Sequence, residues 1–285
     1  VVAGGMESMT SAPYLLPNAR AGYRMGDQTV VDAMMHDALW DAFDRVPMGA
    51  GTEGYTAGQP EITRQRQDAF AAASHERAAA AIKDGRFNDE IVAVSVPQRK
   101  GEPLVIETDE GVRPGTTVET LAALRPAFSK DGTITAGNAS QISDGAAAVI
   151  VMSRAAAERR GVTPLGEVVG YGQVAGPDTS LLTQPSRATK RALERAGLAL
   201  SEVDLFEFNE AFAAVGLASM DDLGLSDDVV NVNGGAIALG HPVGMSGTRL
   251  ALTLLHELKR RGGGLGAAAL CGGGGQGDAL LVRAR

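Results

Sequence analysis

The stretch that decides the fold is Leu205-Phe-Glu-Phe-Asn-Glu-Ala-Phe212, in which an apolar strand runs directly into a helix. Outward from this stretch, from Pro164 to the C-terminal end, strands and helices alternate. The predicted strands are Val168-Val169, Leu205–Phe208, Val229–Val232, Ala267–Leu270 and Ala279–Val282, and the predicted helices are Pro185–Ala196, Glu210–Leu223 and Ser246–Arg261. Such alternation is typical of a layered α/β sheet with helices packed on its faces.

The chain before Pro164 has a different character. Residues from Thr10 to about Gly137 are rich in Met, Gly and Pro and form short segments, which predicts a mixed insertion or covering domain. Within it we expect one long helix, capped by Thr63 and ended by Gly85. Other predicted elements are a buried strand at Val1–Ala3 closed by a Gly4-Gly5 turn, short strands at Val92–Val96 and Leu104–Glu107, a buried strand at Ala146–Met152 and a helix at Ser153–Gly161.

Composition excludes several classes of protein. The 285 residues carry a formal net charge of −8, which argues against a general nucleic-acid binder. No window approaches the roughly 20 apolar residues that a membrane span needs. Cys271 is the single cysteine, so no intrachain disulfide can form, and a cytoplasmic location is the natural expectation. The sequence starts Val1-Val2-Ala3 without a signal peptide, and we expect that it opens in the middle of a larger protein.

Three polar residues follow predicted strands in the α/β region. His241 lies in a glycine-rich loop between a strand and a helix, Cys271 begins Cys-Gly-Gly-Gly-Gly, and Asn209 stands at a helix start. Taken singly, Cys271 reads as a structural thiol and Asn209 as a helix N-cap. Because strand ends in such folds converge on one crevice, a shared site is plausible, in which His and Cys exchange protons. The spacing leaves the reaction open.

The other three histidines carry weaker signals. His75 and His256 lie in predicted helices among charged neighbours, which favours solvated surface positions. His36 stands beside Met34-Met35 and Asp37, and a structural role is the better interpretation. The sequence therefore singles out His241 alone as a catalytic histidine.

Five blocks of this sequence resemble signatures of the thiolase family, in the family's order and over the whole chain. They are Val2-Ala-Gly-Gly-Met-Glu-Ser-Met9, Gly132-Thr-Ile-Thr-Ala-Gly-Asn-Ala-Ser140, Asn209-Glu-Ala-Phe-Ala213, Asn231-Val-Asn-Gly-Gly-Ala-Ile-Ala-Leu-Gly-His-Pro242 and Cys271-Gly-Gly-Gly274. The similarity is greatest to the acetyl-CoA acetyltransferase branch. Thiolases condense two acyl-CoA molecules or run the reverse thiolysis, so the resemblance implies acetyl-CoA, acetoacetyl-CoA and CoA as partners, with no cofactor and no metal.

The resemblance also implies roles for the candidate residues. Cys271 matches the acid–base cysteine, and His241 matches the residue that activates the nucleophile and donates to the thioester oxygen. Asn209 would hold a water that completes this oxyanion hole, and the N–H of Gly273 would contribute to a second hole. The family's nucleophilic cysteine is expected before Val1, so we expect this chain alone to be inactive.

Coenzyme A contacts are implied at six further positions. They are Arg113 at the adenine nucleotide, Ser140 at the pantetheine, Ala136 and Phe128 along the channel, and Met48 and Phe212 at the acyl end. A surface charge is the alternative for Arg113, and core packing is the alternative for Met48. Pro47 stands where many biosynthetic thiolases have a histidine, which puts a polar substrate contact there in doubt.

The implied fold is the five-layered αβαβα thiolase arrangement, with an incomplete N-terminal half and an α+β loop-domain insertion. The expected domains are residues 1–9 and 142–161 as a remnant of the N-terminal half, residues 10–141 as a loop domain for CoA binding and oligomerisation, and residues 162–285 as the C-terminal half. The resemblance further implies a cytoplasmic homo-oligomer of fatty acid metabolism, a tetramer or a dimer.

Three alternative functions stay open at this point. A degradative 3-ketoacyl-CoA thiolase would act on longer chains. A thiolase-like protein that binds acyl-CoA without catalysis is a second alternative, against which intact Asn209, His241 and Cys271 speak. The third is a cysteine hydrolase that uses Cys271 and His241, and it would act on simple esters or peptides without coenzyme A.

Overall fold

A four-stranded mixed sheet forms the centre of the molecule in the computed structural model, which describes residues 1–285. Its strand order is β10-β11-β12-β9, with β10 parallel to β11 and the other pairs antiparallel. The strands are β9 (Glu167–Ala175), β10 (Leu205–Phe208), β11 (Gly264–Gly272) and β12 (Gln276–Ala284). The alternation of strands and helices predicted for this part of the chain is confirmed.

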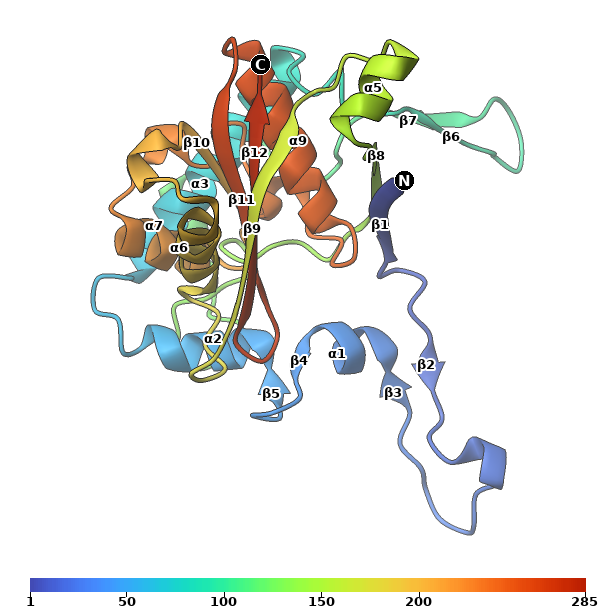
Figure 1. Ribbon diagram of the computed structural model, residues 1–285. Coiled ribbons are helices and arrows are strands. Elements are labelled where there is room, and N and C mark those ends of the chain that lie inside the picture. The colour runs from blue at the N-terminus through green and yellow to red at the C-terminus, as the bar shows by residue number, and fades with distance from the viewer.

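Helices cover both faces of this sheet (Figure 1). On one face lie α6 (Gln184–Ala196) and α7 (Ala213–Leu223), and on the other lies α9 (Ser246–Arg260). The first face buries Phe206 and Phe208 against α6 and α7, whereas Leu205 packs with Leu250, Leu254 and other α9 residues. Because successive residues of β10 point to opposite faces, Glu207 and Asn209 share the α9 side with Leu205. This alternation brings Asn209 to the same side of the sheet as the loop that precedes α9.

One predicted strand of this region does not form in the structure. The predicted strand at Val229–Val232 is wrong: these residues form a 3-10 turn (Asp227–Val229) and a single parallel bridge between Val230 and Phe206. The reason is Asn231, which has φ +46° and whose side chain pairs with both the N–H and the carbonyl of Phe208 at 2.8 and 2.9 Å. The Asn231 side chain thus makes the two hydrogen bonds to Phe208 that the backbone of a neighbouring strand would otherwise make.

Residues before the sheet form a covering region of short elements. These are β2 (Tyr14–Leu15), β3 (Val31–Asp32), α1 (Ala33–Ala38), β4 (Trp40–Asp41), β5 (Val46–Pro47), α2 (Met48–Thr56), α3 (Arg64–Lys83), β6 (Val94–Val96), β7 (Leu104–Ile106) and α4 (Val118–Ala122), with a 3-10 turn at Ala19–Ala21. The long helix is capped as predicted, because the Thr63 side chain accepts from the N–H of Arg66 at 3.2 Å. The helix α3 packs against α7 and α8 (Ala236–Leu239), so it joins this region to the sheet domain.

A separate two-stranded ribbon lies beside α9. It pairs β1 (Val2–Ser8) antiparallel with β8 (Asp144–Ile150), which is followed by α5 (Arg154–Arg160). The predicted Gly4-Gly5 turn is wrong, since the strand continues through both glycines, which lie where a side chain would strike Ala147 or Gly244. Burial of these two strands was also predicted wrongly: β8 alternates between exposed and half-buried residues, because β1 is its only strand neighbour. No helix of the structure combines the length and apolar character that a membrane crossing requires.

Candidate active site

The first component of the site is the His241 loop, residues 231–245, which connects β10 and α7 to α9. Nδ1 of His241 lies 2.6 Å from Ser246 Oγ, and Nε2 lies 3.2 Å from Asn209 Nδ2. The Ser246 hydroxyl donates to the carbonyl of Pro242 at 2.9 Å. In that arrangement Nδ1–H donates to Ser246, and Nε2 accepts from the Asn209 amide. Sequence reasoning missed Ser246, although its position at the start of the helix after His241 was a usable signal.

The environment of His241 keeps its imidazole uncharged. Burial, and secondarily the positive charge of Arg249, lower the pKa of His241 to about 4. The ring is therefore neutral at pH 7, and a neutral imidazole can accept a proton from a thiol or donate its own N–H to an oxygen. Both functions require the ring to be held in place, which the contacts to Ser246 and Asn209 provide.

Asn209 is fully buried at the end of β10. Its backbone N–H donates to the carbonyl of Ala269 at 2.9 Å, which continues the pairing of β10 with β11. The N-cap interpretation of Asn209 is therefore wrong: α7 begins at Ala213, and Phe212 is its N-cap residue. The Oδ1 atom of Asn209 is buried without a hydrogen-bond partner. Such an atom beside His241 is suited to hold a polar group of a ligand or a water.

The second component is the Cys271 turn, residues 271–276, which joins β11 to β12. Burial raises the pKa of Cys271 to about 12, so the thiol is protonated at neutral pH. A thiol raised in this way is a poor resting nucleophile, and it is better suited to donate or accept a proton during a reaction. The N–H of Gly273 has no hydrogen-bond partner in the protein, which leaves it free to donate to a developing oxyanion.

Residues predicted at the acyl end lie together around Cys271. Met48, Phe212 and Cys271 pack against one apolar cluster built from α7 and neighbouring loops. Phe128 meets Phe212 edge to face, with ring centroids 6.2 Å apart, and the Met48 side chain lies against Gly273. The structure thus places Met48, Phe128 and Phe212 close to Cys271 and Gly273 of the turn.

Ser140 lies beside the His241 loop. Its N–H donates to the carbonyl of Ala211 at 3.0 Å, and the next residue, Gln141, accepts from the N–H of His241 at 3.2 Å. The Gln141 side chain donates to the carbonyls of Ile237 and Ala238 at 2.8 and 3.1 Å. Gln141 therefore fastens the Ser140 segment to the His241 loop, and no sequence signal had marked it.

Two predicted CoA contacts are exposed on the covering region. Ala136 and Arg113 both have exposed side chains. The N–H of Arg113 donates to His75 Nδ1 at 3.2 Å, so the surface position predicted for His75 is wrong. His75 lies on α3 with its ring buried, and it accepts this backbone hydrogen bond there. Burial, and secondarily the positive charge of Arg113, lower the pKa of His75. His256 is half-buried and His36 is exposed.

Buried carboxylates hold the His241 loop and the helix that follows it. Glu210 accepts from Asn231 Nδ2 at 2.8 Å, from Ser74 Oγ at 2.7 Å and from the N–H of Ile237 at 3.0 Å. Glu207 pairs with Arg249 of α9 at 3.0 Å. Burial, opposed by Arg249, raises the pKa of Glu207 to about 8. Glu210 contacts two residues of the loop, so its role is to hold the loop, whereas Glu207 links β10 to α9.

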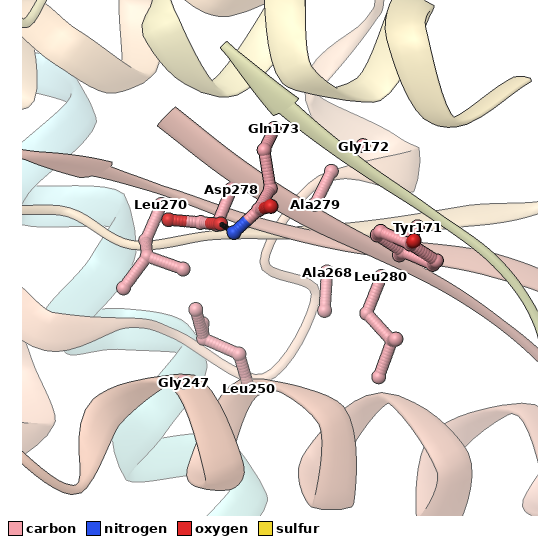
Figure 2. Close-up of a pocket in the computed structure, with 10 residues that line it drawn as sticks. All are labelled: Tyr171, Gly172, Gln173, Gly247, Leu250, Ala268, Leu270, Asp278, Ala279 and Leu280. Carbon is pink, nitrogen blue, oxygen red and sulfur yellow. Dashed lines mark hydrogen bonds between the residues drawn. The ribbon is translucent and has the colours of Figure 1, made fainter. Parts of the chain in front are cut away.

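A separate hollow lies away from these two loops. It has a volume of about 320 Å³ and lies between the sheet and α9, where Figure 2 shows Leu250, Leu270 and Leu280 beside the Gln173–Asp278 hydrogen bond. Its other lining residues are Tyr171, Gly172, Gly247, Ala268 and Ala279. None of the predicted catalytic or CoA-binding residues lines it, so the candidate site rests on the two loops and not on this hollow.

Comparisons with known proteins show which family this chain is similar to. The thiolase N-terminal domain family matches residues 1–155, and the thiolase C-terminal domain family matches residues 162–284. A probable acetyl-CoA acetyltransferase of Mycolicibacterium smegmatis is 58% identical over 283 residues, which cover 99% of this chain and 73% of the relative. The crystal structure of the Bacillus anthracis acetyl-CoA acetyltransferase has a TM-score of 0.95 at 43% identity and covers 100% of this chain and 72% of its own. The human mitochondrial 3-ketoacyl-CoA thiolase in complex with CoA has a TM-score of 0.93 at 42% identity, with 100% and 71% covered. The layered α/β fold class predicted from the sequence is confirmed by these structures.

Proposed function

The chain belongs to the thiolase family, and on this premise we propose that it is an acetyl-CoA C-acetyltransferase. The reaction joins two acetyl-CoA molecules to acetoacetyl-CoA and free CoA, and it runs in reverse as thiolysis. The observation that carries the proposal is the 58% identity to a probable acetyl-CoA acetyltransferase over nearly the whole chain, with the Asn209–His241 contact in place.

The two components of the site divide the chemistry. Cys271 gives its proton to the CoA thiolate that leaves when the first acetyl group is transferred, and the resulting Cys271 thiolate removes a proton from the methyl group of the second acetyl-CoA. Thiolysis runs both proton transfers in reverse. His241 first takes up a proton at Nε2, the nitrogen that is free to accept one, and Nε2–H together with Asn209 then stabilises the enolate oxygen that forms, since thioester enolates need donors at this position. The free N–H of Gly273 serves the second oxyanion, on the acyl group that is transferred.

We propose that Ser140, Phe128, Met48 and Phe212 line the acyl and pantetheine path, because three of them lie around Cys271 and Ser140 lies beside the His241 loop. Arg113 and Ala136 would meet the outer part of CoA, where an exposed guanidinium can face phosphate or stack on adenine. The human neighbour's structure in complex with CoA supports a CoA thioester as substrate. A cytoplasmic homo-oligomer, tetramer or dimer, of fatty acid metabolism belongs to the same proposal.

The nucleophilic cysteine that the resemblance to thiolases implies is not among residues 1–285. Cys271 is the single cysteine of the chain, and its raised pKa fits the acid–base role. We therefore propose that the 285-residue chain alone does not turn over. The gene product that contains these residues is called the natural enzyme below. Measurable acetoacetyl-CoA thiolysis by the 285-residue chain would contradict this part of the proposal.

The test is a chain-length series in thiolysis with the natural enzyme. An acetyl-CoA acetyltransferase prefers acetoacetyl-CoA, and kcat/KM falls as the 3-ketoacyl chain lengthens. A rise with chain length would favour the second candidate, a 3-ketoacyl-CoA thiolase, to which the likeness of the human structure points. Incubation with acetyl-CoA followed by intact-protein mass measurement completes the test, because a catalytic thiolase gains one acetyl group and a non-catalytic acyl-CoA binding protein gains none.

A further inference from the structure

The Cys271 turn is held on three sides, and one of its N–H groups is left free. Gln276 Nε2 donates to the carbonyl of Gly273 at 2.7 Å, and the carbonyl of Gly275 accepts from the N–H of Gly176 at 2.9 Å. The N–H of Gly274 donates to Asp41 Oδ2 at 3.1 Å. The N–H of Gly273 has no partner. The turn is thus fastened at the atoms that surround its free donor.

Asp41 comes from the covering region and is far from the turn in sequence. It lies in β4 and is buried, with 5% of its surface exposed. Its Oδ1 accepts from the N–H groups of Phe43 and Asp44 at 2.8 and 2.9 Å, which closes the tip of the β4–β5 hairpin. Its two oxygens therefore have separate tasks: Oδ1 shapes the hairpin, and Oδ2 reaches across to Gly274.

The bond to Gly274 restrains the neighbouring glycine. Gly273 is joined to Gly274 by a peptide plane whose carbonyl is held by Gln276 and whose N–H is held by Asp41. Glycines otherwise sample a wide range of dihedral angles, and Gly274 itself has φ +78°, with the Phe43 ring where a side chain would be. An oxyanion donor must lie about 2.7–3.1 Å from the oxygen it stabilises, so a freely moving glycine would serve poorly.

We infer that Asp41 is a positioning residue for the oxyanion donor at Gly273, through its acceptor bond to the N–H of Gly274. The inference rests on the proposed function of Gly273 and adds a link that no sequence motif suggests. Through it the covering region, which also supplies Met48 against Gly273, sets the geometry of the acyl-transfer step. Asp41 itself touches neither substrate nor Cys271.

Asp41→Asn is the sharpest variant in the natural enzyme. The asparagine oxygen keeps the bonds to Phe43 and Asp44, while its NH₂ group faces the N–H of Gly274, so only the link to the turn is lost. We expect kcat for acetoacetyl-CoA thiolysis to fall about tenfold, less than the 10²–10³ typical for loss of a whole donor. The KM for CoA should stay close to that of the unsubstituted enzyme, whereas the Tm should fall modestly, because the Asn NH₂ group and the N–H of Gly274 are then two donors without an acceptor.

The matched control is Asp44→Asn, which changes the same hairpin at an exposed carboxylate bonded to Thr179 and not to the turn. It should leave kcat unchanged. Gln276→Ala removes the other restraint from an exposed position without touching the hairpin, so it tests the idea even if Asp41→Asn folds poorly. We expect it to lower kcat too, and the double variant to lose less than the product of the two single losses.

The outcomes separate the inference from the proposed function. A normal kcat in both Asp41→Asn and Gln276→Ala, with Cys271→Ser inactive, would overturn the inference and leave the function standing. Equal losses in Asp41→Asn and Asp44→Asn would also overturn it. If the unsubstituted natural enzyme shows no thiolysis, the proposed function fails, and amide exchange at Gly274 still decides the structural link: Asp41→Asn should speed that exchange, and an unchanged rate would end the inference.

Discussion

The His241 loop and the Cys271 turn are held in different ways. The His241 loop is fixed from every side: Glu210 binds two of its groups, Gln141 binds two carbonyls, and Glu7 of β1 accepts from the N–H of Gly244 at 3.2 Å. Nearly all of these partners are buried or half-buried. The Cys271 turn is shorter, is built from glycines and depends on a few bonds near the surface. The difference indicates that contacts around His241 carry folding stability, whereas contacts around Cys271 govern the rate of reaction.

The largest expected effect belongs to the turn. Cys271→Ser keeps the shape of the side chain and replaces the thiol by a far weaker acid. We expect thiolysis by the natural enzyme to fall by at least about 10³, within the range that general acid–base groups contribute. The Tm should stay the same within error. Activity within tenfold of the unsubstituted enzyme would remove Cys271 from the acid–base role. A large loss of stability would contradict the view that the Cys271 turn governs the rate of reaction and not folding stability.

Asn209→Ala tests the junction between the loop and the sheet. It removes the amide next to His241 Nε2 while the backbone bond to Ala269 stays in place. We expect kcat to fall about 10²-fold, as for loss of one oxyanion-hole contact, with a smaller change in KM. Steady-state kinetics of the natural enzyme measure this. A change in KM alone would instead assign Asn209 to ground-state binding of acetyl-CoA.

Glu210→Gln should act on stability. The Glu210 carboxylate accepts hydrogen bonds from three donors. The glutamine amide has an NH₂ group in place of one carboxylate oxygen, and this group cannot accept a hydrogen bond. A buried donor left unpaired costs about 1–3 kcal/mol, so we expect the free energy of unfolding to fall by about 2 kcal/mol. Denaturant unfolding measures it, with Glu76→Gln as control because Glu76 is exposed on α3. An unchanged midpoint for Glu210→Gln would show that the loop does not depend on this carboxylate.

The sequence predicted the sheet and its helices, because apolar periodicity is a local signal. Glycine-rich strand ends marked His241, Cys271 and Asn209, whose catalytic roles stay predictions. The sequence placed Asn209 wrongly as an N-cap, since a side chain that continues a strand edge and one that caps a helix look alike in sequence. The prediction of a strand at Val229–Val232 was wrong for a similar reason: the side-chain amide of Asn231, and not its backbone, pairs with the backbone of Phe208. His75 and Asp41 were beyond reach, because each meets its partner across a distance in sequence that no local pattern records.

The smallest expected effect concerns pH, and it separates the two components again. Burial raises the pKa of Glu207, which links β10 to α9 through Arg249, to about 8. Because this pKa lies above the ordinary value of 4.5, the folded state binds the proton more tightly than the unfolded state. The stabilisation is therefore complete below about pH 4.5 and declines as the pH rises toward 8. No buried carboxylate with a raised pKa touches the Cys271 turn.

Glu207→Gln should consequently flatten the pH dependence of unfolding. Between pH 6 and 7 the unsubstituted natural enzyme should lose on the order of 1 kcal/mol more than the variant, since one pKa unit corresponds to about 1.4 kcal/mol. Glu90, whose pKa burial raises to about 7, acts in the same direction, so Glu90→Gln is measured beside it. Denaturant unfolding at pH 6 and pH 7 gives the comparison. Parallel curves for Glu207→Gln and the unsubstituted enzyme would mean that Arg249 keeps Glu207 ionised throughout, and the link between β10 and α9 would then be a permanent ion pair.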